Sequence, residues 1–328
     1  MTHKFDVLGI GNAIVDILVH VEDDFLSARE IPKGSMQLVD EATSEKLYAN
    51  LGQAIECSGG SAANTIAGLA SMGCNTAYIG KTKNDQLGHV FDHDIKSLGI
   101  EFTTEKDGSG AATAHCLVMV SPDAERTMCT YLGACVNLME KDIDEAQVAG
   151  ATVTYMEGYL WDPEQAKAAF RKAMKLAHKA GRKTSLSLSD SFCVDRHKQE
   201  FLHLAEHEID ILFANEEELL MLYDTRNLNE AIKAVQQHCE VTAITRGAKG
   251  CTIVSRHDII DINGRPISNL VDTTGAGDLF AAGFLNGYTK NLDLATCGRM
   301  GNLVASEVIT HMGARPDVNL EHYLTENL

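Results

Sequence analysis

The order of apolar segments along the chain constrains its fold more than any other feature of the sequence. Short runs of strand length alternate with longer segments of helical period. The expected strands are 5–11, 76–81, 152–158, 183–189, 210–215 and 241–247, and the expected helices are 60–73, 85–98, 163–180, 228–239, 275–290 and 293–311. Parallel strands joined by crossover helices produce this alternation, so the sequence predicts an α/β fold with helices on both faces of a layered sheet. Ligands of such sheets bind beyond the carboxyl ends of the strands.

Two segments interrupt the alternation. Residues 17–39 and 111–131 look like pairs of short strands around turns. Inserted strand pairs of this kind can form a small sheet that closes over a site as a lid. The sequence therefore predicts an α/β core of residues 1–16, 40–110 and 132–328 and a small β lid of residues 17–39 and 111–131.

The formal net charge limits the class of partner. The chain has 28 Lys and Arg against 46 Asp and Glu, a net charge of −18, which argues against nucleic acid because phosphates require a basic surface. Asp6 and Asp16 interrupt the apolar N-terminal stretch, which predicts neither a signal peptide nor a membrane span. Nine cysteines without a C-x-x-C pair are typical of reduced thiols. We expect a cytoplasmic protein with small-molecule partners.

The strongest local motif runs from Val271 to Asp278 with the sequence VDTTGAGD and leads directly into an apolar helix. The backbone N–H groups of Gly275, Ala276 and Gly277 are expected to be unpaired at the helix N-terminus, where an anion such as a transferring phosphoryl group can approach closely. Asp278 follows in the first turn, where its carboxylate can accept a proton from an attacking alcohol. The alternative is a first-turn acid that merely complements the helix dipole.

A second glycine motif, SGGSAAN at 58–64, opens another predicted helix. Gly59 and Gly60 allow the backbone to approach a ligand, and Asn64 offers hydrogen bonds to ligand hydroxyls. The small residues that follow, Ala67, Gly68 and Ala70, are better explained by close packing of the helix against the sheet.

A third motif follows the first predicted strand and contains Gly9, Gly11, Asn12 and Asp16. A dinucleotide fingerprint needs a further small residue at position 14, which is Ile, so that interpretation is rejected. Asn12 and Asp16 can instead bind vicinal hydroxyls, because a carboxylate accepts two hydrogen bonds from a diol. The sequence has no G-x-x-x-x-G-K-[ST] loop, which excludes a P-loop NTPase.

Asn215 lies at the end of a predicted strand, and Glu216, Glu217 and Glu218 follow it. The dipole of the next helix is enough to explain the first two acids. Mg²⁺ bound mostly through water needs only one or two carboxylates near the phosphates, and Glu218 can provide one.

Taken in chain order, GNAIVD, SGGSAANTIAGLASMG, FANEEEL, ITRGAKG and DTTGAGDLFAAGF resemble the PfkB, or ribokinase-like, family of carbohydrate and nucleoside kinases. The resemblance spans nearly the whole chain, and the last motif is the most specific. It implies an ATP-dependent phosphotransferase with a three-layer α/β/α core, a mostly parallel central sheet and a small β-sheet lid. It also implies Mg²⁺ and, for some members, K⁺.

The resemblance assigns roles to the matching residues. Asp278 is similar to the catalytic base of the family, with Gly275, Ala276 and Gly277 as its anion hole. The implied substrate-binding residues are Asn12, Asp16, Gly59, Gly60 and Asn64, with Cys116, Leu132, Tyr159 and Phe192 as walls. The implied ATP-binding residues are Asn215, Thr245, Arg246, Gly247, Asn302 and Ser306. Glu218 matches a position linked to Mg²⁺ through water, and Asp272 and Thr274 match a monovalent-cation loop.

Within the family, YMEGYLWDPE and LSLSDSF are most similar to adenosine kinases. Tyr159 stands where those enzymes carry an aromatic residue that can stack on a purine, although an ordinary core aromatic is the alternative. We therefore expect transfer of the ATP γ-phosphoryl group to the 5′-hydroxyl of a purine nucleoside, with adenosine giving AMP and ADP. The alternatives are a ribose or fructose kinase, an inosine or guanosine kinase, and an inactive nucleoside-binding sensor. We expect a monomer rather than a dimer.

Overall fold

The computed structural model describes residues 4–123 and 125–328. The remaining four positions fall within the predicted core and lid segments and lie outside the described residues. Within the described part, nine strands form one large sheet in the order β14-β13-β12-β11-β10-β9-β1-β5-β6. Its strands are β1 (Phe5–Ile10), β5 (Thr76–Ile79), β6 (Glu101–Phe102), β9 (Ala151–Glu157), β10 (Lys183–Ser187), β11 (Ile211–Asn215), β12 (Val241–Thr245), β13 (Cys251–Ser255) and β14 (Ile259–Ile262). The strands from β6 to β12 are parallel, whereas β13 and β14 pair antiparallel.

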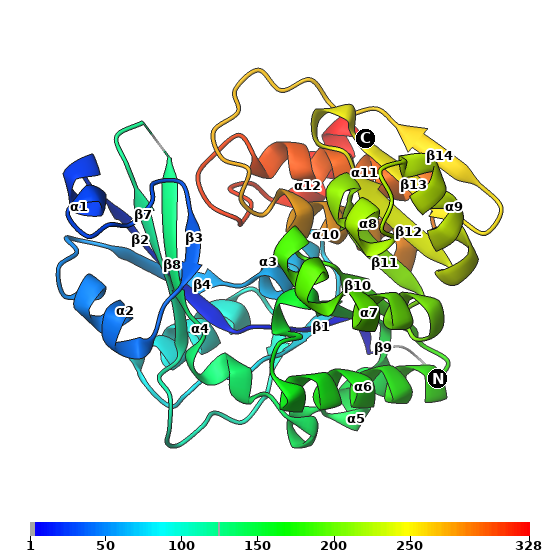
Figure 1. Cartoon of the computed structure of the whole chain (residues 1–328). Helices are drawn as coiled ribbons and strands as arrows, with labels where there is room; N and C mark the ends of the chain where they lie inside the picture. The colour runs from blue at the N-terminus through cyan, green and yellow to red at the C-terminus, as the bar shows by residue number, and fades with distance from the viewer. Residues whose placement is uncertain (1–3, 124) are drawn as a thin grey trace.

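Helices cover both faces of this sheet (Figure 1). On one face lie α3 (Ser61–Ser71), α10 (Ala276–Thr289), α11 (Leu294–Val308) and α12 (Leu320–Asn327). On the other lie α5 (Glu145–Gly150), α6 (Glu164–Lys179), α7 (Ser191–His207), α8 (Glu216–Leu222) and α9 (Leu228–His238). Because each parallel strand is buried on both sides, its residues alternate between two separate hydrophobic cores. The predicted three-layer α/β/α architecture is confirmed.

A second sheet stands to one side of the main body, at the left of Figure 1. Its strand order is β3-β8-β7-β2-β4, with bounds β2 (Ile14–His20), β3 (Met36–Leu38), β4 (Ile55–Gly59), β7 (Ala114–Val120) and β8 (Arg126–Tyr131). The neighbouring helices are α1 (Asp23–Ser27), α2 (Glu41–Tyr48) and α4 (Gln86–Ser97). Four of the five strands overlap the predicted lid segments, so the smaller sheet is where the sequence analysis expected it.

The smaller sheet, however, also includes residues outside the predicted lid segments. It includes β4, which was assigned to the core segment 40–110, and β2 begins at Ile14, within the core segment 1–16. The sequence of β4, IECSG, lacks the regular alternation of a half-buried strand, and its pairing with β2 is set by tertiary contact. The division into a core and a moving lid remains a prediction.

The strand order reverses direction between β1 and β9. From β1 the chain proceeds outward to β5 and β6, and then returns to build the opposite half of the sheet from β9 onward. Such a switch point leaves a crevice beyond the carboxyl ends of the two strands. Asn12 follows β1 and Glu157 ends β9, so both residues lie at this position.

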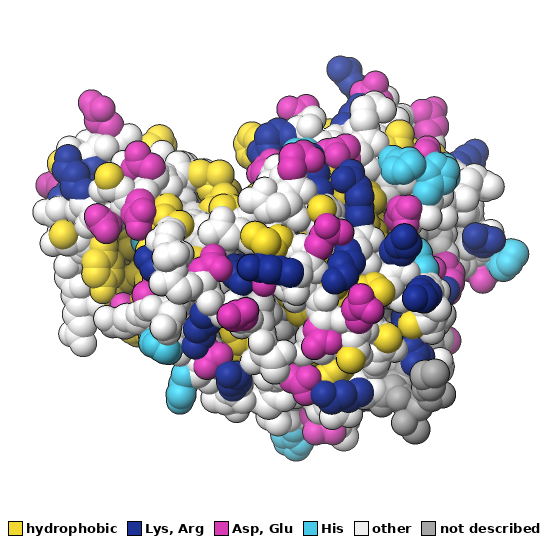
Figure 2. Space-filling model, turned by 90° about the horizontal axis from the view of Figure 1, so that it is seen from below, with side chains coloured by type: hydrophobic (Ala, Val, Ile, Leu, Met, Phe, Trp, Pro, Cys, Tyr) yellow, Lys and Arg dark blue, Asp and Glu magenta, His cyan; other side chains and the backbone are white. Residues whose placement is uncertain are grey.

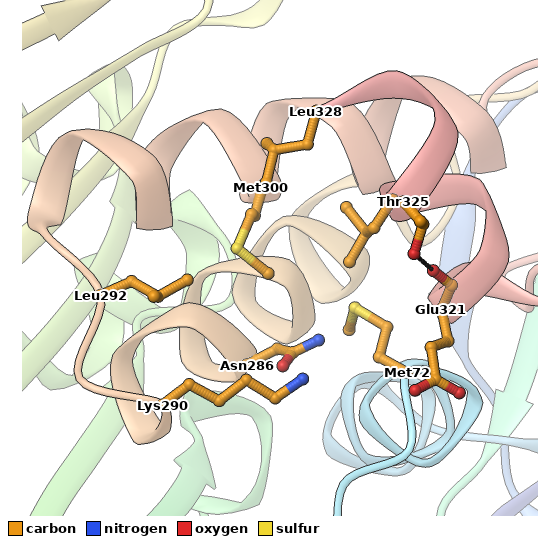
Figure 3. A pocket seen from close by; sticks show the side chains of 9 residues that line it. Met72, Asn286, Lys290, Leu292, Met300, Glu321, Thr325 and Leu328 are labelled. Carbon is orange, nitrogen blue, oxygen red and sulfur yellow. Dashed lines mark hydrogen bonds between the residues drawn. The ribbon is translucent and has the colours of Figure 1, made fainter.

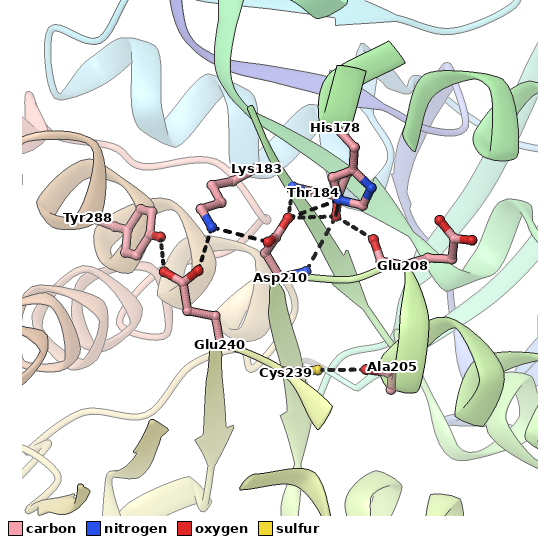
Figure 4. Close-up of polar contacts among 9 residues, drawn as sticks. All are labelled: His178, Lys183, Thr184, Ala205, Glu208, Asp210, Cys239, Glu240 and Tyr288. Atoms are coloured by element: carbon pink, nitrogen blue, oxygen red, sulfur yellow. Dashed lines mark hydrogen bonds and ion pairs between the residues drawn. The ribbon is translucent and has the colours of Figure 1, made fainter. Parts of the chain in front are cut away.

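A polar cluster joins the opposite, amino ends of the strands (Figure 4). Lys183 contacts both Asp210 and Glu240, and the Tyr288 hydroxyl at the end of α10 donates to Glu240 over 3.1 Å. Asp210 also accepts hydrogen bonds from the backbone N–H and the hydroxyl of Thr184. These contacts tie α10 to three strand ends on the side of the sheet away from the switch point.

Acidic and basic side chains are interspersed over the face of the molecule shown in Figure 2. All nine cysteines are unpaired, and all except Cys57 are buried. Among the described residues, the helices are too short or too polar to cross a membrane.

Candidate active site

Asp278 lies in the first turn of α10, and its carboxylate is held by two side chains from α3. The Ser61 hydroxyl donates to Oδ1 over 2.6 Å, and the Asn64 amide donates from Nδ2 to Oδ2 over 3.1 Å. Burial raises the pKa of Asp278 to about 6, while the two hydrogen bonds and the charge of Arg315 oppose that shift. The carboxylate is therefore mostly ionised at neutral pH and can accept a proton.

The glycines before Asp278 shape the N-terminus of α10. Gly275 is the N-cap residue with a φ of +77°, and a Cβ built there would lie 2.7 Å from Ala314. A Cβ built on Gly277 would meet no described atom within 4 Å, so the helix end is open on that side. The expectation of three free N–H groups was wrong in one respect, because the N–H of Ala276 donates to the carbonyl of Thr273 over 3.2 Å. This turn bond leaves at most two free amides in the predicted anion hole.

The N-terminus of α3 faces that of α10 because small residues let the two helices approach. A Cβ built on Gly68 would lie 2.7 Å from Leu279, and the Thr65 hydroxyl donates to the Asp278 carbonyl over 3.1 Å. The packing role predicted for Gly68 is confirmed, although its partner is a helix rather than the sheet. Gly60 caps α3 with a φ of +94°, and a Cβ there would lie 2.3 Å from the Asn12 carbonyl oxygen.

Asp16 and Cys116 face the site from the smaller sheet. They are direct neighbours on β2 and β7, and Cys57 on β4 flanks Asp16 on its other side. Gly59 closes β4 so tightly that a Cβ there would lie 2.3 Å from the Asp16 carboxylate. Burial raises the pKa of Asp16 to about 6, with Arg315 and Arg126 opposing and Asp278 adding to the rise. The two carboxylates predicted for the site therefore influence one another.

Glu157 is a site residue that the sequence analysis did not identify. Its side chain is 0% exposed at the end of β9 and accepts three hydrogen bonds, from the Asn12 N–H (2.8 Å), Asn12 Nδ2 (2.7 Å) and the Ala62 N–H (2.6 Å). A Cβ on Gly11 would lie 2.5 Å from this carboxylate. Burial raises the pKa of Glu157 to about 7, and the hydrogen bonds from Ala62 and Asn12 oppose the rise. A charged residue at the end of an otherwise uncharged strand was the available signal.

Asn12 itself is 2% exposed, and its Oδ1 has no hydrogen-bond partner among the described residues. Because Glu157 holds the amide nitrogen, the oxygen is the end of Asn12 left to accept a bond from a ligand hydroxyl.

Two arginines that the sequence analysis did not single out also reach the site. Arg126 on β8 pairs with Asp272 over 2.8 Å, with side chains 9% and 7% exposed. Arg315 follows α11, and its Nε donates to Asn64 Oδ1 over 2.9 Å. Nothing in the surrounding sequence distinguishes these arginines from surface ones, since their partners are more than 140 residues away.

The residues predicted to bind ATP lie beyond the ends of β11 and β12. Asn215 and Thr245 are register partners at these ends. Asn215 and Glu218 form a capping box, in which Glu218 accepts from both nitrogens of Asn215 and its own N–H donates to Asn215 Oδ1. Burial raises the pKa of Glu218 to about 7. The motif thus has a clear structural role, whereas the predicted metal role stays a prediction.

The other predicted ATP residues are more dispersed. Arg246 follows β12 and donates from Nε to Glu216 over 3.2 Å, and Gly247 opens the 3-10 turn η4 (Gly247–Lys249). Asn302 and Ser306 lie one turn apart on α11, where Asn302 donates to the Asn263 carbonyl and Ser306 to the Leu303 carbonyl.

The predicted walls of the acceptor site differ in burial. Tyr159 in η3 (Gly158–Leu160) is partly buried, and its hydroxyl donates to the Ser189 carbonyl over 3.3 Å. Leu132 immediately precedes η1 (Gly133–Asn137) and is partly buried. Phe192 on α7 is 75% exposed, so it does not form a wall of a closed site in this structure. Its predicted role as a wall would require α7 to move toward the acceptor.

Asp272 and Thr274, predicted to bind a monovalent cation, form a turn before α10. Besides pairing with Arg126, the Asp272 carboxylate accepts the N–H groups of Thr274 and Gly313, each over 3.0 Å. Arg126 thus supplies the positive charge at this carboxylate, and a cation site remains a prediction.

One cavity lies away from these residues (Figure 3). It has a volume of about 350 Å³ and lies between α3, α10, α11 and α12. Met72, Met300 and Leu292 form much of its wall, and Asn286 and Lys290 extend into it from the end of α10 opposite Asp278. None of the predicted site residues line it. A smaller cavity of about 240 Å³ adjoins the site, with Cys57, Asp94 and Arg315 in its wall.

The switch-point location, the glycine-lined start of α10 and the paired carboxylates are the arrangement expected of a phosphotransferase that acts on a hydroxyl group. The model of the pfkB family of carbohydrate kinases matches residues 37–320. This match covers most of the chain, which therefore belongs to the pfkB family.

Two solved structures and one sequence relative agree with this assignment. Adenosine kinase from Sinorhizobium meliloti has 46% identity and a TM-score of 0.92, with 99% of this chain and 100% of that one covered. A probable sugar kinase from Rhizobium etli CFN 42 has 45% identity and the same TM-score, with 99% of each chain covered. A fructokinase from Salmonella typhimurium is 25% identical over 302 residues, which are 86% of this chain and 97% of the fructokinase. The relatives therefore establish a kinase without specifying its acceptor.

Proposed function

We propose that this kinase transfers the γ-phosphoryl group of ATP to the 5′-hydroxyl of a purine nucleoside, with adenosine as the preferred acceptor. The observation that carries the proposal is the Asp278 carboxylate, fixed by Ser61 and Asn64 at the open N-terminus of α10. The similarity to the Sinorhizobium meliloti adenosine kinase and the proximity of Tyr159 to Asp278 support a nucleoside.

In the proposed reaction, Asp278 accepts the proton of the 5′-hydroxyl as the new O–P bond forms and the bond from the γ-phosphorus to ADP breaks. Gly275, Gly277 and the dipole of α10 stabilise the negative charge of the transferring group. Positioning and charge stabilisation supply most of the acceleration, and the base contributes about 10²–10⁴-fold.

The acceptor diol is proposed to lie between Asn12 and Asp16. The Asp16 carboxylate and the unpaired Oδ1 of Asn12 are the acceptors for the hydrogen bonds that the two hydroxyls of the diol donate. The side-chain oxygen of Asn64 already accepts from Arg315, and one N–H of its amide donates to Asp278. The second N–H of the Asn64 amide remains for the ligand. Closure of the smaller sheet over the acceptor would exclude water that competes for the phosphoryl group.

ATP is proposed to lie along the ends of β11 and β12, with Asn215, Thr245, Arg246 and Gly247 near its phosphates. Asn302 and Ser306 on α11 would contact its base. The buried carboxylate of Glu218 is suited to orient the waters of a phosphate-bound Mg²⁺, which would neutralise phosphate charge. A monovalent cation such as K⁺ at Asp272 and Thr274 would have to share the Asp272 carboxylate with Arg126, which already pairs with it.

A sugar kinase for ribose or fructose is the second candidate. It is favoured by the names of the Rhizobium etli and Salmonella typhimurium relatives and by the diol-binding groups, which sugars and nucleosides would share. Inosine and guanosine are further acceptors that the same aromatic residue would accommodate. An inactive nucleoside-binding sensor is disfavoured because the base and its glycines are present.

An acceptor panel tests the proposal. ADP formation from ATP and Mg²⁺ is measured with adenosine, inosine, guanosine, ribose and fructose. We expect kcat/KM for adenosine to exceed that of ribose and fructose at least about 10-fold, because only a nucleoside gains the hydrophobic and stacking contact, which contributes roughly 1–3 kcal/mol. Among the purine nucleosides, adenosine is expected to be preferred. Higher kcat/KM for ribose or fructose would overturn the nucleoside assignment. Tight adenosine binding without ADP formation would indicate the sensor.

The same proposal includes a monomer in the cytoplasm that acts on small molecules and binds neither nucleic acid nor membranes. The interspersed surface charges and the net charge of −18 support this part. Sedimentation of the purified protein tests the proposed monomer, and a dimer would contradict it.

A further inference from the structure

Arg315 contacts the proposed catalytic machinery although no reaction step assigned above uses it. It lies in the segment between α11 and α12, directly after Ala314, which packs against the N-cap Gly275 of α10. Its Nε donates to Asn64 Oδ1 over 2.9 Å. The segment is thereby fixed to the N-termini of both helices that form the Asp278 site.

The chemistry of the arginine side chain determines which way the Asn64 amide points. A guanidinium group can only donate hydrogen bonds, so the amide oxygen must face Arg315. The amide nitrogen then faces Asp278, to which it donates over 3.1 Å. Without Arg315, rotation of the amide by 180° would place an oxygen against the Asp278 carboxylate and remove that bond.

We propose that Arg315 is a positioning residue that fixes the Asn64 amide and, through it, orients the Asp278 carboxylate for proton abstraction. This inference rests on the proposed role of Asp278 as the base. It extends that role to a residue 37 positions later in the chain, in a segment that the sequence analysis left without a function.

The charge of Arg315 has a second effect on the site. Asp278 is faced by Ser61 and Asn64 from α3, by Tyr155 and Glu157 from β9 and by Asp16 from β2. Arg315 also lies near Cys57 of β4, Asp94 of α4 and Tyr78 of β5, and Arg126 of β8 is near Asp16. Because Arg315 opposes the rise in pKa of both Asp16 and Asp278, its removal should raise both values further.

The hydrogen bonding of Arg315 argues against a purely stabilising function. Its Nη2 is buried without a hydrogen-bond partner among the described residues. A buried donor without a partner is unfavourable for folding. An apolar side chain of similar length should therefore be tolerated by the fold, which makes a substitution here a test of chemistry rather than of stability.

The experiment compares Arg315→Met and Arg315→Lys with the wild type, using whichever acceptor of the panel gives the highest turnover. The profile of kcat/KM against pH and the limiting kcat at high pH are measured for each. Arg299→Met is the matched control, because Arg299 lies on the exposed side of α11 and donates only to Thr296 of its own helix among the described contacts.

We expect Arg315→Met to lower the limiting kcat about 10–100-fold, as for a misplaced reacting group. We also expect it to move the acid limb of the profile from near pH 6 to higher pH. Arg315→Lys should restore the position of the limb, because it keeps the charge, but not the limiting kcat, because it lacks the Nε donor. In an Asn64→Ala background, Arg315→Met should lower kcat much less than in the wild type.

Three results would overturn the inference: unchanged kcat and limb in Arg315→Met, full recovery of kcat in Arg315→Lys, or an equal loss in the Asn64→Ala background. Asp278→Asn distinguishes a failure of the proposed function from a failure of this inference. Near-normal turnover of that variant would show that Asp278 is not the base, whatever the result for Arg315. Thermal unfolding of each variant confirms that the comparison is made between folded proteins.

Discussion

At the scale of single residues, the site is a cluster of carboxylates whose pKa values are raised by burial. Asp16 and Asp278 rise to about 6, and Glu157 and Glu218 to about 7. Of these four carboxylates, Asp278 and Asp16 were the two predicted to contact the acceptor. Glu157 was missed because its role depends on contacts with Asn12 and Ala62. Shifts of this kind gather at functional sites and oppose folding.

Asp278→Asn should lower kcat about 10²–10⁴-fold, because an amide cannot accept the acceptor's proton. Nucleoside binding, measured by calorimetry, should change little, since Asp16 and Asn12 remain in place. Asp24→Asn on the exposed helix α1 is the matched control and should leave kcat unchanged. Near-normal turnover of Asp278→Asn would contradict the role of Asp278.

The stability of the fold should depend on pH through Glu157. Its pKa rises from 4.5 in the unfolded chain to about 7 in the fold, so the folded state holds this proton longer. Stability contributed at this position therefore decreases as pH increases from about 4.5 to about 7.

Glu157→Gln removes this titration. The free energy of unfolding of the wild type, relative to the variant, should fall by a few kcal/mol between those pH values, because one pKa unit corresponds to about 1.4 kcal/mol. Urea denaturation at a series of pH values measures the difference. A pH-independent difference would show that Glu157 titrates normally.

At the scale of elements, the predicted strands and helices agree with the structure where the apolar period is regular. Helices at 60–73 and 275–290 correspond to α3 and α10 within one or two residues. By contrast, α7 was absent from the expected helices, and its backbone is non-helical at His197, which interrupts the helical period. The antiparallel strands β13 and β14 were also missed, since they do not belong to the strand-helix alternation.

Gly60→Ala should disturb the junction of β4 and α3. The backbone has a φ of +94° there, and the added Cβ would lie 2.3 Å from the Asn12 carbonyl oxygen. Gly99 is the matched control, because its φ of +79° is also left-handed but a Cβ would meet no described atom within 4 Å. We expect Gly99→Ala to destabilise by roughly 1–2 kcal/mol, the cost of a left-handed backbone, and Gly60→Ala by clearly more. Equal losses in urea denaturation would show that Asn12 moves aside.

At the scale of the whole molecule, the ion pair between Arg126 on β8 and Asp272 links the smaller sheet to the segment before α10. Both side chains are buried, and Asp272 is further held by two backbone N–H groups. The smaller sheet therefore contributes a charge to the segment that leads into the proposed anion hole. This contact gives the predicted lid a specific attachment to the core.

Arg126→Met should destabilise the protein by about 3 kcal/mol, the lower end for breaking a buried pair, because Asp272 keeps its two N–H partners. Lys33→Met is the control from the same half of the molecule, since Lys33 pairs with two exposed aspartates and its loss should change stability little. Thermal and urea unfolding measure both. Equal effects of the two substitutions would contradict the structural role of the Arg126 pair.

The sequence by itself determined the order of the α/β elements, the family resemblance and the placement of Asp278 at a helix N-terminus. These features depend on local periodicity and on glycines within a few residues of one another. Only the tertiary structure decided that Ser61, Asn64, Glu157, Arg126 and Arg315 surround the two site carboxylates. The Arg315–Asn64 bond joins residues 251 positions apart, so it exists only because α3, α10 and the segment after α11 pack together. Packing at that distance leaves no local signal in the sequence.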